Sequence, residues 1–111
     1  MKTRPFIGQS SVSQLALGTW GLSGDGYGPV SEAVQDEVLH RARAYGITLY
    51  ETADVYGRGA MEQRLGRLFG ADPSVTIVTK IGTDLSVMPQ RKRFDAAYLR
   101  DACARSSERL A

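Results

Sequence analysis

Short apolar runs and helix-like patterns alternate along this chain about every 30 residues. Three runs, Leu15–Trp20, Ile47–Thr52 and Val75–Ile81, are rich in apolar or β-branched residues, which predicts buried strands. Between these runs, Ser31–Tyr45 and Ala60–Phe69 place apolar residues at helical spacing. Repeated strand–helix units of this kind predict an α/β fold with a parallel sheet.

The predicted helices each present one apolar face and have recognisable ends. Gly46 follows the first helix, where the chain has to turn left-handed, and Asp95 can cap a third helix that runs to Ala111. The faces consist of Val34, Val38, Leu39, Ala42 and Tyr45 on the first helix, Met61, Leu65, Leu68 and Phe69 on the second, and Leu99, Cys103, Ser106 and Leu110 on the third. We therefore expect Cys103 to lie in the core.

Two segments follow this alternation poorly. Near the N-terminus, Phe6–Gly8 and Ser11–Val12 could form a small hairpin that turns at residues 8–10. After the third strand, Gly82–Arg93 is predicted to be a loop, and its basic run Arg91–Arg93 a solvated part of that loop.

Size and composition fit one small soluble domain that covers residues 1–111. The net charge of +2 gives no electrostatic case for binding nucleic acid or an anionic membrane. No apolar run approaches the ~20 residues that a membrane helix needs. One cysteine cannot form an internal disulfide, which suits a cytoplasmic protein, and one histidine with one cysteine excludes a conventional zinc site.

Three side chains with chemical potential follow the second and third predicted strands. Glu51 and Tyr56 lie at and after the end of the second strand, and Lys80 lies at the end of the third. Taken singly, each has an ordinary explanation, since a tyrosine after a strand usually packs and a strand-end lysine usually reaches water. Neighbouring parallel strands, however, end at the same edge of a sheet, so the three groups are expected to meet there.

Glu51, Tyr56 and Lys80, placed together, would be suited to acid catalysis. Lys80 would pair with Glu51 and approach the phenol of Tyr56. A neighbouring cation favours the ionised form of a phenol, so the phenol releases its proton more readily. A phenol tuned in this way can donate a proton to a carbonyl oxygen while hydride reaches the carbon.

The sequence pieces around these residues resemble one family. Residues 15–82 are similar to the N-terminal part of the aldo-keto reductases, especially the bacterial and potassium-channel-β-like branch. The matching pieces are Leu17–Gly21, Gly46–Gly57 with its Thr-Ala-Asp-Val-Tyr-Gly core, Glu62–Gly66 and Val78–Lys80.

The resemblance implies a (β/α)8 barrel that moves hydride from NADPH to aldehydes and ketones, so a small carbonyl compound is the expected substrate. It implies that Tyr56 is the proton donor and Lys80 its partner, with Glu51 in the position of the family's catalytic Asp. Gly18, Thr19, Trp20 and Glu51 would lie near the nicotinamide. The physiological substrate and the choice between NADPH and NADH stay open.

Two departures from the family pattern affect this expectation. Glu51 keeps the charge of the family Asp but adds a methylene group, and Asp54 is a possible stand-in. The family histidine follows the fourth strand, which is not present in residues 1–111, and His40 is expected to be structural or at the surface.

We therefore expect residues 1–111 to be a partial barrel, with an N-terminal hairpin and about three strand–helix units, truncated before the fourth strand. As an NADPH-dependent reductase this chain would be weakly active or inactive. The alternative is a non-catalytic module that self-associates, or docks onto a partner, through an open parallel sheet. An incomplete gene product without a role of its own is a third possibility.

Overall fold

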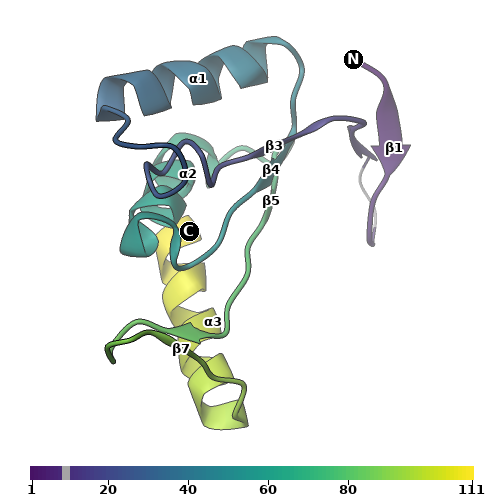
Figure 1. Ribbon diagram of the computed structural model, residues 1–111. Coiled ribbons are helices and arrows are strands. Elements are labelled where there is room, and N and C mark those ends of the chain that lie inside the picture. Colours follow the sequence, from purple (N-terminus) through teal and green to yellow (C-terminus); the bar gives the residue numbers. More distant parts are fainter. Residues whose placement is uncertain (9–10) are drawn as a thin grey trace.

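The computed structural model describes residues 1–8 and 11–111, and it places three helices and short strands around one parallel sheet (Figure 1). The strands are β1 Thr3–Pro5, β2 Ser11–Ser13, β3 Ala16–Gly18, β4 Leu49–Glu51, β5 Thr76–Val78, β6 Thr83–Asp84 and β7 Arg91–Lys92. The helices are α1 Glu32–Ala44, α2 Ala60–Phe69 and α3 Ala96–Leu110, with a short 3₁₀ segment, η1, at Tyr56–Gly59. This arrangement confirms the predicted α/β fold with three βα units.

The central sheet has the strand order β3-β4-β5, and all its strands run parallel. Because side chains alternate across a strand, residues in register share a face. Leu17, Tyr50 and Ile77 are in register and pack toward the helices. Gly18 and Glu51 are in register on the opposite face, which no helix of the described chain covers.

The core lies between the sheet and the helices α1 and α2. It consists of Leu39, Tyr50, Met61, Leu65 and Phe69, all nearly or fully buried. The rings of Tyr50 and Phe69 stack with their centroids 4.9 Å apart, which adds to the stabilisation from apolar burial. The predicted apolar face of α2 is therefore confirmed.

The helix ends follow their sequence signals. The side chain of Ser31 accepts a hydrogen bond from the Val34 N–H, and that of Asp95 accepts one from the Tyr98 N–H. Gly46 has φ 89°, a left-handed conformation that glycine adopts at little cost.

The predicted faces of the first and third helices were partly wrong. Val34 on α1 and Tyr45, which follows its last residue, are 46% and 76% exposed, because the buried line of the helix runs through Gln35 and Leu39. On α3, Cys103 is exposed, and the prediction that it lies in the core was wrong. The buried residues of α3 are Ala102 and Ser106, whose small side chains suit a close contact with α2.

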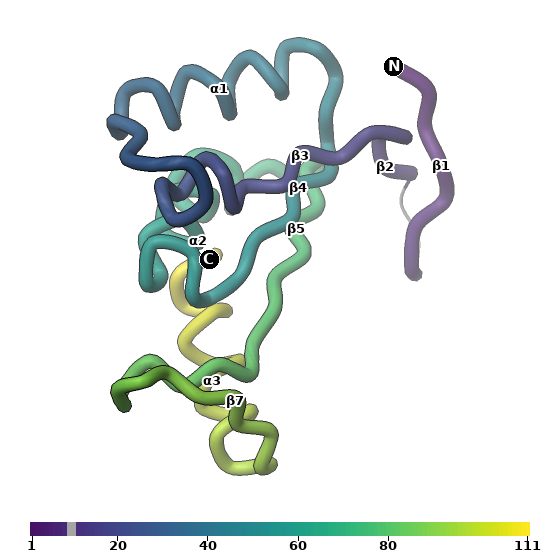
Figure 2. Tube along the Cα trace, viewed as in Figure 1, coloured from purple at the N-terminus to yellow at the C-terminus, as the bar shows by residue number. Residues whose placement is uncertain are grey.

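The helices α2 and α3 approach each other very closely. A Cβ atom added at Gly66 would collide with the backbone carbonyl of Arg109. Figure 2 shows the result, since the last turn of the chain runs beside α2. A larger residue at position 66 would push the two helices apart.

The loop predicted at 82–93 contains structure that the sequence did not reveal. Strands β6 and β7 pair antiparallel in it, and the Arg93 guanidinium bonds to the carboxylates of Asp84 and Asp95. The basic run is therefore a strand of a hairpin rather than a free loop, because paired backbone and two carboxylates fix its position.

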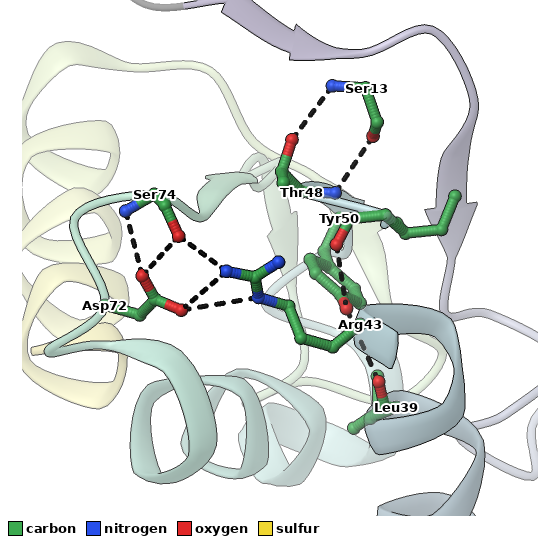
Figure 3. Close-up of polar contacts among 8 residues, drawn as sticks. Ser13, Leu39, Arg43, Thr48, Tyr50, Asp72 and Ser74 are labelled. Carbon is green, nitrogen blue, oxygen red and sulfur yellow. Dashed lines mark hydrogen bonds and ion pairs between the residues drawn. The ribbon is translucent and has the colours of Figure 1, made fainter. Parts of the chain in front are cut away.

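The N-terminal hairpin exists, but its strands are Thr3–Pro5 and Ser11–Ser13 rather than a pair that begins at Phe6. The predicted turn at 8–10 includes residues 9 and 10, which lie outside the described residues. Figure 3 shows how the hairpin is attached: Ser13 and Thr48 exchange two hydrogen bonds, from each backbone N–H to the other hydroxyl, at 2.8 and 2.9 Å. These bonds hold the hairpin at the end of the sheet where β4 begins.

A second polar cluster in Figure 3 connects α1 to the turn before β5. The Arg43 guanidinium bonds to the Asp72 carboxylate at 3.2 Å and to the Ser74 hydroxyl at 2.6 Å. Hydrogen bonds from Ser74 lower the pKa of Asp72 from its usual value. This cluster fixes β5 in register with β4 and so helps to determine what meets at the far end of both strands.

Candidate active site

The candidate site lies where β4 and β5 end. Beyond the strands, the Thr52 N–H donates to the Val78 carbonyl at 2.8 Å, and the Asp54 N–H donates to the Lys80 carbonyl at 3.0 Å. These bonds continue the parallel ladder, so Lys80 emerges from the sheet next to the segment that follows Glu51. The carboxyl edge of a parallel sheet is where α/β enzymes carry out their chemistry.

Glu51 and Lys80 form an ion pair between Glu51 Oε1 and Lys80 Nζ. Glu51 Oε1 is shielded from water and has no hydrogen-bond donor other than this ammonium in the described part of the chain. Desolvation lowers the pKa of the Lys80 amine from its ordinary value, whereas the adjacent carboxylate favours the ammonium form. Both side chains keep partial access to solvent, at 38% and 51% exposure, so a small molecule can reach them.

Tyr56 completes the group. The Lys80 Nζ lies over the Tyr56 ring, 4.8 Å from its centroid, which is a cation–π contact. A tight turn directly after Tyr56 holds the phenol there. Gly57, Arg58 and Gly59 all have positive φ, at 59°, 54° and 95°, and for Arg58 this conformation is unusual. The acid, phenol and amine that the sequence predicted at one rim are therefore brought together.

Gly18, Thr19 and Trp20 lie on the neighbouring strand end. The Thr19 N–H and hydroxyl both donate to the Glu51 carbonyl, at 2.9 and 3.0 Å, which fixes the backbone at this point. Gly18 pairs with Glu51 in the sheet and is exposed on the uncovered face. Trp20 is 46% exposed and meets Tyr27 edge-to-face with ring centroids 5.5 Å apart.

Asp25 is a site residue that sequence reasoning missed. Its Oδ2 accepts hydrogen bonds from the Gly57 N–H at 2.8 Å and from the Ser23 hydroxyl at 2.9 Å. The glycine-rich loop after Trp20 is thereby attached to the turn that follows Tyr56. No local signal marks Asp25, because its partner lies 32 residues away.

Asp54, considered as a stand-in for the family Asp, does not pair with Lys80. Burial raises the pKa of the Asp54 carboxyl, and the nearby Glu62 carboxylate raises it further. Asp54 shares a cavity of about 460 Å³ with Tyr56, Lys80 and Lys92. It is a second acidic group beside the site, while Glu51 holds the lysine.

Other candidate groups lie elsewhere in the described part of the chain. His40 is on α1, where its ring meets Phe69 edge-to-face at 6.3 Å. Within residues 1–8 and 11–111 there is no group of three or more side chains that could hold a metal ion. The same residues contain no helix that is long and apolar enough to cross a membrane.

Strand–helix units with polar side chains at the carboxyl edge of a parallel sheet are the arrangement of the (β/α)8 barrel class. A sequence model described as the Aldo/keto reductase family matches residues 14–111, and the chain belongs to this family. The resemblance seen in the sequence is thus confirmed.

Individual relatives agree with this assignment. The chain is 34% identical over 106 residues to an uncharacterised oxidoreductase of Mycobacterium bovis, covering 89% of this chain and 33% of that protein. It is 37% identical over 79 residues to an NADP(+) aldo-keto reductase of Schizosaccharomyces pombe, covering 68% of this chain and 23% of that protein. The chain therefore spans about a third of the length of the curated relatives, or less.

Solved structures give the same result. An aldo-keto reductase from Bacillus halodurans in its holo form superposes with a TM-score of 0.82 at 26% identity, covering 99% of this chain and 36% of that chain. One from Klebsiella pneumoniae in complex with NADPH gives 0.62 at 25% identity, covering 92% of this chain and 32% of that chain. These neighbours are (β/α)8 barrels, and this chain corresponds to part of one.

Proposed function

We propose that this chain carries the proton-donating part of an NADPH-dependent carbonyl reductase site. The observation that supports this most directly is the convergence of Glu51, Lys80 and Tyr56 at one rim of the sheet. Aldehydes and ketones are the substrate class, because a phenol held beside an ammonium suits proton transfer to a carbonyl oxygen.

Each residue has a distinct role in this proposal. Tyr56 donates the proton to the carbonyl oxygen. Lys80 places a positive charge over the Tyr56 ring, where it stabilises the negative charge that develops on the phenol in the transition state. Glu51 keeps the Lys80 ammonium at the rim through its ion pair, and so acts through Lys80.

The residues near Gly18 fit the nicotinamide end of the cofactor. Gly18 leaves a stretch of exposed backbone without a side chain beside Glu51, and Trp20 offers a half-exposed aromatic face. Thr19 holds this backbone in place through its bonds to the Glu51 carbonyl. When bound, the nicotinamide supplies hydride to the carbonyl carbon, while Gly18, Thr19, Trp20 and Glu51 shape the site that receives it.

Alone, residues 1–111 are expected to reduce carbonyl compounds weakly or not at all. The only histidine, His40 on α1, meets Phe69 of α2 edge-to-face, so it cannot take the place of the family's catalytic histidine at this rim. The uncovered face of the sheet also leaves the site open to water, which weakens electrostatic stabilisation.

A chimera tests the role of Tyr56. Residues 1–111 would replace the corresponding part of the Bacillus halodurans relative, and NADPH oxidation with a reactive aldehyde would be followed. We expect reduction that falls by about 10²–10⁴ in kcat for Tyr56→Phe. Tyr45→Phe, at an exposed position on α1, is the matched control and should change nothing. Equal rates for the Tyr56→Phe chimera and its parent would rule out the proposal, and rapid turnover by residues 1–111 alone would contradict the expected weak activity.

The second candidate function is a non-catalytic module that associates through its sheet. Both β3 and β5 are edge strands, and Val78 is 37% exposed on the uncovered face. Unpaired edges and uncovered apolar surface favour association with a second copy or a partner chain. The two functions are compatible, since an associated chain can keep the same rim.

A further inference from the structure

The two oxygens of the Glu51 carboxylate face different neighbours. Its Oε1 pairs with the Lys80 Nζ, and its Oε2 is directed at Gly18 on the adjacent strand. A Cβ atom at position 18 would lie 3.3 Å from this Oε2, closer than an ordinary contact. The Glu51 carboxylate therefore takes up part of the space beside Gly18, whose backbone is otherwise exposed.

The backbone conformation at position 18 does not require a glycine. It is absent from the glycines with positive φ, so its backbone has a conformation that other residues adopt readily. Glycine inside a strand is otherwise unfavourable, and it often marks a close approach of another group. The close approach here is the side chain of Glu51.

The length of Glu51 explains why that space is needed. Neighbouring strands lie only about 4.8 Å apart, so side chains in register on one face compete for the same volume. Glutamate carries its carboxylate one methylene further than aspartate does. At position 51, the longer side chain needs space beside Gly18 for Oε2 while Oε1 contacts Lys80.

We propose that Gly18 is a positioning residue: its missing side chain provides the room in which the Glu51 carboxylate turns onto Lys80. The contact exists whether or not the chain is catalytic, and its importance for carbonyl reduction rests on the proposed function. Positions 18 and 51 are then coupled: a side chain at 18 displaces the Glu51 carboxylate, and a shorter acid at 51 avoids this displacement.

The test is a double-mutant cycle with Gly18→Ala and Glu51→Asp, read out by NMR titration of Lys80 in the 111-residue chain. The chain has three lysines, Lys2, Lys80 and Lys92, so the side-chain signals are few and can be assigned by substitution. In Gly18→Ala we expect the Lys80 titration midpoint to fall by about half a unit to one unit, because the carboxylate that favours the ammonium is pushed away.

In the Glu51→Asp background, Gly18→Ala should produce no further change, because the shorter carboxylate no longer reaches the added methyl group. Ala16→Val is the matched control: it adds bulk to the same strand and face, but its register partner is Leu49. This control should leave the Lys80 midpoint unchanged. Equal shifts from Gly18→Ala in both backgrounds, or none in either, would overturn the inference.

Folding provides a second readout. If Gly18→Ala alone does not fold, the double variant should fold, because Glu51→Asp removes the tight contact at 3.3 Å. If the double variant is unfolded as well, the effect of the added methyl group does not act through Glu51, and the inference fails. None of these measurements needs turnover, so they stand apart from the effect of Tyr56→Phe, which tests the proposed function alone.

Discussion

At the scale of single residues, the buried polar groups determine how this protein responds to pH. Tyr50 is fully buried, and its hydroxyl makes only long contacts with the carbonyls of Leu39 and Ile47, at 3.4 and 3.5 Å. Burial raises the pKa of Tyr50 to about 12. The unfolded chain, in which a tyrosine ionises near ~10, therefore releases this proton first as pH rises.

This difference predicts an alkaline loss of stability. Between about pH 10 and pH 12 the unfolded state binds fewer protons than the folded state, so the free energy of unfolding falls with rising pH. Tyr50 should account for about 2–3 kcal/mol of the fall. Urea unfolding across this pH range should therefore show a shallower decline in Tyr50→Phe, but not in Tyr27→Phe, whose ring is 85% exposed. Parallel declines in both variants would mean that Tyr50 ionises normally.

At the scale of elements, one buried carboxylate on α2 connects α3 to the residue that follows β5. Glu62 is fully buried; its Oε2 accepts from the Arg109 Nε at 2.7 Å, and its Oε1 accepts from the Thr79 hydroxyl at 2.6 Å. Both oxygens are therefore satisfied, which a buried charge requires. Together with the close contact at Gly66, this pair fixes the C-terminal helix on the rest of the fold.

Removal of the arginine should be costly. Arg109→Met leaves the Glu62 charge buried without its cation, and we expect about 3–5 kcal/mol of destabilisation in urea unfolding. The double variant Arg109→Met with Glu62→Gln should recover part of this, because no charge is then buried. Arg41→Met is the control: its pair with Glu37 is 71% and 58% exposed, so its loss should cost under about 1 kcal/mol. A similar cost for both single variants would show that the Glu62 pair is effectively solvated.

Part of the fold and of the candidate site could be predicted from the sequence. The helix ends at Gly46 and Asp95 could be predicted because caps depend on a few neighbouring residues. The meeting of Glu51 with Lys80 was predictable because parallel neighbours end at one edge of a sheet.

Features that depend on tertiary packing could not be predicted from local patterns. The bond from the Gly57 N–H to Asp25 depends on two loops meeting, and the exposure of Cys103 depends on how α3 is rotated against α2. The β6–β7 hairpin has strands of two residues each, too short to give an alternating pattern.

At the scale of the whole molecule, the fold exposes more surface than its mass requires. The accessible surface is 7012 Å², whereas a compact protein of 12.1 kDa exposes about 6,000 Å². The radius of gyration of 14.4 Å likewise exceeds the roughly 13 Å expected for this length. The excess of about 1,000 Å² is somewhat more than the ~800 Å² that one partner contributes to a standard interface.

We therefore expect residues 1–111 to associate in solution. The melting temperature should rise with protein concentration, because association stabilises the folded state by mass action. Sedimentation across the same concentrations should show species larger than a monomer. Val78→Lys, which places a charge on the uncovered face, should shift the population toward monomer, whereas Tyr45→Lys on α1 should not. A sharp monomer with a concentration-independent melt would exclude the associating module.

The reciprocal bonds between Ser13 and Thr48 have a practical consequence for experiments on this protein. Strand β4 has the N-terminal hairpin at its first end and Glu51 at its last, and the Met1 side chain lies against Gly46, before the strand begins. An affinity tag or a surface tether attached at Met1 is thus separated from Tyr56 and Lys80 by the length of the strand. Immobilised in this way, the chain should leave the edge that carries Glu51, Tyr56 and Lys80 open to the buffer, so a binding assay on a sensor chip should not require removal of the tag.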